Sequence, residues 1–206
     1  MMLRRLAVLV ALLAPATASA DILKLFAEVQ GGAMVGEGTS GDAKDAAFFA
    51  HARHPMYGAE VGVEVLIFDA WIQHQQFTNG SDLATWTSFG LGIHQGVDLG
   101  SEQDKKLHKG AFIDLGVGAW FGLGTGQQVM PPLDNAQITD KGFLLEGRFG
   151  IGTHLSSTFD LGVEIPVSWG YFIKNNDGTT INDQNGHYQG LQGELIAFLR
   201  LNIGLL

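Results

Sequence analysis

The clearest pattern in the chain is the alternation of apolar and polar or small residues over Leu191–Leu205. Leucine, isoleucine or alanine occupies most odd positions, while Gln192, Glu194, Arg200 and Asn202 occupy even ones. Successive side chains of a β-strand point to opposite faces, so this stretch predicts one apolar and one polar face. Strands of soluble proteins usually stop near five or six residues, whereas a strand that crosses a bilayer needs about 9–11. The pattern therefore predicts a membrane-crossing strand.

The same alternation recurs seven times before this stretch. It predicts strands at Leu23–Val35, Tyr57–Ile67, Ala70–Phe77, Trp86–Val97, Ala111–Phe121, Phe143–His154 and Phe159–Tyr171. Eight alternating strands are an even number, as in single-chain outer-membrane barrels. The predicted fold class is therefore all-β, an eight-stranded antiparallel up-and-down transmembrane β-barrel. A soluble β-sandwich remains the alternative.

The connections between the predicted strands are unequal in length. Those after the first, third, fifth and seventh strands are mostly long and polar, which predicts an external position for them and for Asp134 and Asp177. The connections at Ile67–Asp69 and Ser156–Thr158 are tight turns expected on the periplasmic side, and Asp98–Lys109 is a longer exception. In the first long connection, Asp42–His54 favours a short helix that Ser40 or Asp42 caps and Pro55 ends. Pro166, inside the seventh strand, predicts a bulge.

The N-terminus has the features of a secretory signal peptide. Arg4 and Arg5 precede a short apolar run, and Ala18–Ser19–Ala20 resembles a cleavage site. The predicted division is a cleaved signal peptide over residues 1–20 and a barrel domain over residues 21–206. Without the two signal arginines, 10 basic and 21 acidic residues leave a net charge of −11, which argues against nucleic acid as a partner. The sequence has no cysteine, so disulfides and cysteine metal sites are excluded.

Aromatic residues lie mostly toward the ends of the predicted strands that are expected to be external. Tyrosine and tryptophan prefer the membrane–water interface, because one part of the ring is apolar and the other polar. The residues predicted to contact outer-membrane lipid at that interface are Tyr57, Phe77, Trp86, Trp120, Phe121, Phe143, Trp169, Tyr171 and Tyr188.

Charged residues gather on the face predicted to point into the barrel. They are Lys24, Glu28, Glu60, Glu64, Asp114, Glu146, Arg148, Glu164, Glu194 and Arg200. One interpretation is a polar plug in which Arg148 and Arg200 reach Glu164, Glu28 or Asp114, because buried charges must be paired. The other is a narrow path that prefers cations. The interior of an eight-stranded barrel is just wide enough for side chains, which favours the plug.

Catalytic and metal-binding patterns are weak in this sequence. His51 and His54 with Asp45 have a spacing that could bind a metal on a helix, but a third firm ligand is lacking, so no metal and no cofactor is predicted. His154 followed by Ser156 and Ser157 resembles the His and Ser of outer-membrane lipid A deacylases. The group falls at a predicted periplasmic turn, His154 points inward and no acid is evident beside it, so no catalytic residue is assigned.

The eight alternating strands and unequal connections make the mature chain resemble the small outer-membrane barrels of the OmpA, OmpX and OmpW type. This resemblance covers architecture and includes no signature motif, and the chain ends on Leu206 where such proteins commonly end on an aromatic residue. It implies residence in a Gram-negative outer membrane and insertion by the barrel assembly machinery. It also implies a non-enzymatic structural role, or docking of envelope proteins on the external loops. A narrow transport barrel and a lipid-modifying enzyme are the alternatives.

Overall fold

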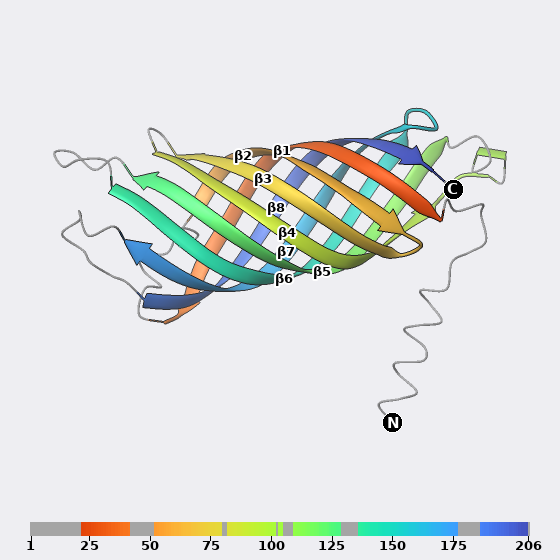
Figure 1. The fold of residues 1–206 in the computed structure, drawn as a ribbon. Helices are drawn as coiled ribbons and strands as arrows, with labels where there is room; N and C mark the ends of the chain where they lie inside the picture. The colour runs from red at the N-terminus through yellow and green to blue at the C-terminus, as the bar shows by residue number, and fades with distance from the viewer. Residues whose placement is uncertain are drawn as a thin grey trace, which may run out of the picture.

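Eight antiparallel strands form a closed barrel in the computed structural model, with each strand hydrogen-bonded to its neighbours in sequence and β1 bonded to β8 (Figure 1). The structure describes residues 22–41, 52–79, 82–101, 103–104, 109–128, 136–176 and 186–205. The strands are β1 (Leu23–Ser40), β2 (Ala52–Val65), β3 (Phe68–Asn79), β4 (Asp82–Asp98), β5 (Gly110–Gln128), β6 (Ala136–His154), β7 (Phe159–Asn176) and β8 (Gly186–Gly204).

The two ends of the barrel differ. The start of β1, the end of β8 and the short β2–β3 and β6–β7 connections lie at one end, here named the turn end (Figure 1). The opposite end, where β1 finishes and β2 begins, is named the loop end. Among the described residues, no helix is long and apolar enough to cross a membrane.

The sequence alternation becomes an apolar outer wall and a mixed inner face. Along β8, odd positions such as Leu191, Leu195 and Leu199 are exposed, while Gln192, Glu194 and the other even residues are buried through Arg200. Leu115 and Val117 on β5, predicted to face lipid, are likewise exposed. Each strand therefore follows the predicted period of two.

Glycines on the inner wall make room for large inward side chains. A Cβ atom added at Gly90 would lie 2.2 Å from the Trp71 ring, and one at Gly122 would lie 2.3 Å from the Trp86 ring. Trp71 and Gly90 are direct partners across the β3–β4 ladder, and Gly122 lies two residues from the β5 partner of Trp86, so each indole occupies the space that a glycine leaves. The high glycine content thus has a packing role inside the barrel.

The strands extend beyond the predicted boundaries. The stretch Gly124–Gln128 pairs with Ala136–Asp140, although both were predicted as loop. The predicted helix is also wrong at its end: Ala52, Arg53 and His54 belong to β2, and Pro55 continues that strand. The remainder of the predicted helix, and with it His51, lies outside the described residues, as do Asp134 and Asp177. Backbone pairing across a closed ring extends these strands past their apolar residues.

Two local predictions need correction. The β2–β3 turn lies at Leu66–Ile67 and not at Ile67–Asp69, with Leu66 in the left-handed region at φ 61°. This conformation suits a tight two-residue hairpin, although leucine seldom adopts it. Pro166 causes no bulge, since Glu164–Ile196 and Val167–Gly193 keep one register on either side of it. Pro166 lacks an N–H and interrupts the ladder to β8 without shifting it.

The β4–β5 connection is held by a local cap. The hydroxyl and the backbone N–H of Ser101 both donate to the Asp104 carboxylate, at 2.5 and 3.1 Å. These hydrogen bonds lower the pKa of Asp104 below its ordinary value, because they favour the charged carboxylate. The Lys109 N–H donates to the Asp104 carbonyl oxygen at 3.0 Å, which brings the chain back toward β5.

Candidate functional site

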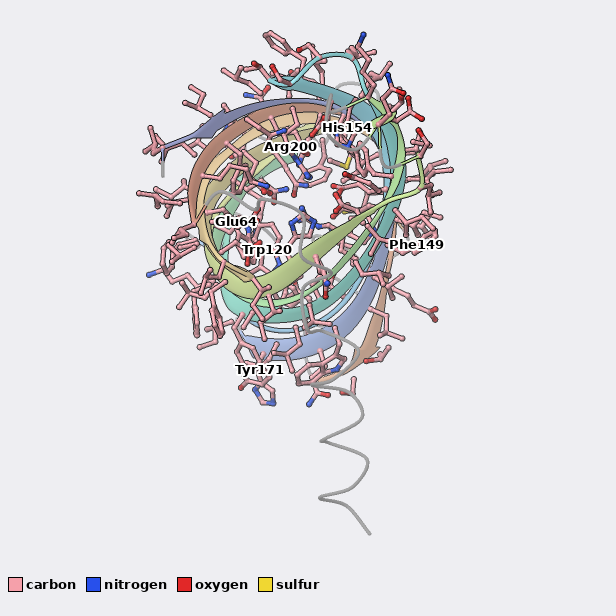
Figure 2. All side chains as sticks on the ribbon, turned by 90° about the vertical axis from the view of Figure 1, so that its right-hand side faces the viewer. Glu64, Trp120, Phe149, His154, Tyr171 and Arg200 are labelled. Carbon is pink, nitrogen blue, oxygen red and sulfur yellow. The ribbon has the colours of Figure 1, made fainter. Side chains whose placement is uncertain are left out.

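The inside of the barrel is the candidate site, because it gathers the buried charges of the chain. Figure 2 shows Glu64, Trp120 and Arg200 within the ring of strands, whereas Phe149 and Tyr171 lie on its outer side. All ten charged residues predicted for the interior have buried or partly buried side chains. Most of their contacts fall into two groups, one around each arginine.

Arg200 on β8 links three strands. Its Nε donates to Glu28 Oε2 at 2.6 Å and its Nη1 to Asp114 Oδ2 at 3.0 Å. The guanidinium carbon also lies 4.8 Å from the centre of the Phe198 ring and 6.0 Å from that of Phe26. Glu28 is the neighbour of Arg200 across the β1–β8 ladder, whereas Asp114 reaches it across the lumen from β5. Arg200 therefore connects β8 with its neighbour β1 and, across the lumen, with β5.

Arg148 on β6 faces three carboxylates. Its Nε and Nη2 both lie 3.1 Å from Glu146 Oε1, while Glu60 and Glu164 are at 3.6 and 3.7 Å from its guanidinium nitrogens. The guanidinium also lies 5.6 Å from the centre of the Trp120 ring. Glu164 is 0% exposed, and neither of its carboxylate oxygens has a hydrogen bond within the described part of the chain. The single guanidinium of Arg148 therefore lies within ion-pair distance of three carboxylates.

Amides extend this network toward the loop end. Gln73 donates to Gln30 at 3.1 Å, and Gln30 donates to Glu28 at 2.7 Å. Glu194 accepts hydrogen bonds from Gln75 and from Gln192. Side-chain amides supply donors without adding charge, so they partly compensate for the scarcity of basic residues.

Acidic side chains outnumber basic ones inside the described barrel. The acids include Glu28, Glu60, Glu64, Asp69, Asp114, Glu146, Asp160, Glu164 and Glu194, against Lys24, His94, Arg148, His154 and Arg200. Asp69 and His94 were absent from the predicted network. Both residues follow the inward parity of their strands, so the alternation contained the signal for them.

A small cavity lies beside these acids toward the turn end. Its volume is ≈ 20 Å³, and Glu60, Asp69, Trp71 and His94 contribute to its lining. The buried Trp71 Nε1 and Glu60 Oε2 have no hydrogen-bond partner among the described residues. A polar cavity of this size has room for roughly one or two water molecules. A water there could accept from Trp71 and donate to Glu60.

Apolar side chains gather on the inner face toward the loop end, beside the amides and Glu194. A cluster of buried side chains, named here the apolar layer, consists of Met34, Met56, Phe77, Trp86, Leu144, Phe172, Tyr188 and Ile196. The Phe172 ring stacks on Tyr188 at 4.8 Å and meets Trp86 edge-on at 5.7 Å. These ring contacts pack β4, β7 and β8 against one another inside the described barrel.

The predicted belt of membrane-interface aromatics is wrong for four of its nine residues. Phe77, Trp86, Trp120 and Tyr188 are at most 3% exposed and lie inside the barrel. Their positions have the inward parity of their strands, and glycines opposite the indoles leave room for them. The other five do face outward, and they are Tyr57, Phe121, Phe143, Trp169 and Tyr171. Phe143 contacts Trp169 and Tyr171 at 5.8 and 6.1 Å between ring centres.

His154 at the turn end does have acidic partners, contrary to the sequence analysis. Its Nδ1 lies 2.6 Å from Asp160 and its Nε2 lies 3.0 Å from Asp98, while Asn202 donates to Asp160 at 2.6 Å. The Ser156 hydroxyl instead accepts hydrogen bonds from the backbone N–H groups of residues 158 and 159. Because both nitrogens of His154 face carboxylates, this arrangement offers no serine for the imidazole to activate. The cluster connects β4, β6, β7 and β8.

Metal ligands do not converge in the described part of the chain, where no group of three or more His, Asp or Glu side chains could hold an ion. The carboxylates are instead spread around the wall, each toward an arginine, a histidine, a lysine or an amide. Lys24, for example, lies 2.5 Å from Glu64 at the turn end.

An eight-stranded antiparallel ring with an apolar outer wall and buried charges on its inner face defines the fold class, a closed antiparallel β-barrel. An apolar outer band is characteristic of the barrels of outer membranes. Among solved structures, the chain is similar to Neisserial surface protein A (NspA), with 12% identity, a TM-score of 0.49, and coverage of 87% of this chain and 96% of that one. It is also similar to the N-terminal β-barrel domain of Pseudomonas aeruginosa OprF, with 10% identity, a TM-score of 0.43, and coverage of 86% and 97%. No family model and no curated protein matches the sequence.

Proposed function

We propose that this protein is an integral, non-enzymatic protein of a Gram-negative outer membrane, whose closed barrel anchors external loops that have a structural or docking role. The observation that carries the proposal is the combination of an apolar outer wall with a lumen filled by side chains. Residues 1–20 would be its cleaved signal peptide, and the barrel assembly machinery would insert it. Lipid would surround the wall, and envelope proteins would be the partners of the loops.

The apolar layer supports a closed lumen. Its side chains are buried against one another at the loop end, so a solute entering from outside would have to displace packed aromatic rings. The charged half of the interior is cross-linked by Arg148 and Arg200, which suits a plug because the planar guanidinium can serve two carboxylates at once. Both features support a lumen that is closed to solutes within the described barrel.

The surplus of carboxylates and the adjoining cavity favour a second candidate, a narrow path that prefers cations. Planar-bilayer recording of the refolded protein distinguishes the two functions. We expect no stepwise conductance from the closed barrel. Repeated cation-selective openings would contradict the anchor function and support transport.

The apolar layer also offers a matched pair of variants for the same recording. Removing two of its rings, as in Trp86→Ala with Phe172→Ala, should allow openings that the acidic interior makes cation-selective. Phe149→Ala removes an outward ring and should leave the bilayer silent. Conductance from the Phe149 variant, or silence from a folded double variant, would show that the apolar layer is not what closes the lumen.

The topology of the barrel is tested by labelling on whole cells. The chain contains no cysteine, so a single introduced cysteine reports one position. A cysteine at Thr39, exposed at the loop end, should react with an impermeant thiol reagent on intact cells. A cysteine at Ser157, exposed at the turn end, should react only after the outer membrane is opened. The reverse pattern would invert the proposed orientation.

A further inference from the structure

The outer wall is uneven around the barrel. The outward residues of β7 are apolar or aromatic from Phe159 to Ile173, whereas on β3 they are apolar only from Phe68 to Ile72 and continue as His74 and Gln76. β3 has 12 residues, whereas β7 has 18. On β4 the outward residues are likewise apolar from Phe89 to Ile93, with Thr87 next toward the loop end, whereas β2 is apolar from Ala59 to Val65. The face formed by β3 and β4 therefore presents a shorter apolar strip than the face formed by β7 and β8.

Polar side chains replace the apolar strip on this face. His74 Nδ1 lies 2.8 Å from the Thr87 hydroxyl, and the Tyr57 hydroxyl donates to Gln76 Oε1 at 2.5 Å. The Gln76 amide nitrogen lies 3.4 Å from His74 Nε2 and joins the two pairs. These four residues, named here the outer polar patch, come from three neighbouring strands. Tyr57, His74 and Thr87 are exposed on the outer wall.

The apolar strip of β3 is shorter than the apolar band of an ordinary outer-membrane barrel. Phe68 to Ile72 covers four residue steps, or about 13 Å along the strand before any tilt. The apolar band of outer-membrane barrels is about 25 Å tall. A hydrophobic strip that is too short is accommodated by local thinning of the bilayer. Headgroups of the outer leaflet would then descend to the level of the outer polar patch.

The chemistry of the outer polar patch indicates which headgroup fits there. The patch contains a phenol, an imidazole, a carboxamide and a hydroxyl, and none of its four residues is a lysine or an arginine. Recognition of phosphate favours the charged forks of arginine or the ammonium of lysine. Neutral groups that both donate and accept hydrogen bonds instead match the hydroxyls of a sugar. The exposed Tyr57 ring can also pack against the sugar ring.

We propose that the outer polar patch is a binding site for the sugar headgroup of a glycolipid, at a place where the barrel thins the outer leaflet. The inference rests on the proposed membrane location. Such binding would hold the glycolipid on one face of the barrel, the face that carries the outer polar patch.

Thinning is tested by the depth of a fluorophore on two faces of the barrel in phosphatidylcholine vesicles. Bimane is attached to Phe89→Cys, two residues from Thr87 on the same outward face, or to Val167→Cys in the apolar run of β7. Bimane at position 89 should emit at longer wavelength and be quenched by aqueous iodide, while bimane at position 167 should be shielded. Equal shielding at both positions overturns the inference. Iodide access at position 167 as well means that the membrane location itself is wrong.

Sugar recognition is tested by adding digalactosyl diacylglycerol or phosphatidylglycerol to the same vesicles. The emission wavelength of bimane at position 89 should shift when the galactolipid is added. The double variant His74→Leu with Gln76→Leu should require about tenfold more galactolipid, as expected for the loss of one or two hydrogen bonds. Gln95→Leu, which removes an outward amide outside the patch, should leave the response unchanged. An equal response to phosphatidylglycerol, or no effect of the double variant, overturns the proposal.

Discussion

Replacing Arg200 with alanine should lower the free energy of unfolding by about 3–5 kcal/mol. Arg200 is the hydrogen-bonding partner of the buried carboxylates Glu28 and Asp114, at 2.6 and 3.0 Å. Its removal leaves Glu28 inside the wall without a cation and leaves Asp114 with only His94, whose Nε2 lies 2.9 Å from Asp114 Oδ1. An uncompensated buried carboxylate costs more than the lost hydrogen bonds alone. Equilibrium unfolding in urea of the barrel refolded into phosphatidylcholine vesicles measures this change.

A neutral replacement of the whole group is the matched control. Arg200→Met combined with Glu28→Gln and Asp114→Asn removes the guanidinium together with its two carboxylate charges. This triple variant should recover most of the stability that Arg200→Ala loses, because both carboxylate charges are removed together with the guanidinium and His94 keeps Glu64 at 3.9 Å. If Arg200→Ala lowered the free energy of unfolding by less than about 1 kcal/mol, a value typical of an exposed ion pair, the polar plug would have no structural importance.

The outer wall should be sensitive to charge according to depth. Leu199 is 40% exposed and pairs with Val29, in the first half of β1, and with Leu161, near the start of β7. Leu199→Arg should cost about 2–4 kcal/mol, the cost of an arginine at the bilayer midplane. Leu205→Arg, just beyond the end of β8, should cost about 0–1 kcal/mol. The same urea titration compares the two variants, and equal costs would mean that Leu199 does not face the hydrocarbon.

The strand order and the inward or outward direction of most side chains could be predicted from the sequence. A period of two is enough to place Leu199 outside and Arg200 inside, once one face is known to be apolar. The contacts of Arg200 with Glu28 and Asp114 were also among those that the sequence suggested, since β1 and β8 must meet when the barrel closes. Because the closed ring makes β1 the neighbour of β8, a contact between Glu28 and Arg200 follows from the order of the strands.

The errors have identifiable physical causes. Trp86 and Tyr188 were assigned to the lipid interface from their residue type, although Trp86 has the opposite parity to outward Phe89. Parity was the stronger signal, because a one-residue change moves a side chain across the wall. The preference of tryptophan for interfaces was overridden by the space that inward glycines such as Gly122 provide.

Other features depend on three-dimensional packing and had no sequence signal. The pairing of His154 with Asp98 joins β6 to β4, which are separated by β5 in the sheet. The continuation of β2 through Pro55 depends on its partner strand, because proline normally ends a regular element. Such contacts are decided by how far each strand is tilted and shifted relative to the next.

The most direct test of the central claim is a spin-label scan along β8 from Leu195 to Leu201 in lipid vesicles, which compares collisions with oxygen and with a water-soluble nickel chelate. Oxygen concentrates in the hydrocarbon, whereas the chelate remains in water. Labels at positions 195, 197, 199 and 201 should be accessible to oxygen and shielded from nickel, and those at positions 196, 198 and 200 should be shielded from both. Nickel access at the odd positions, or accessibility without a period of two, would contradict a lipid-embedded barrel with a closed interior.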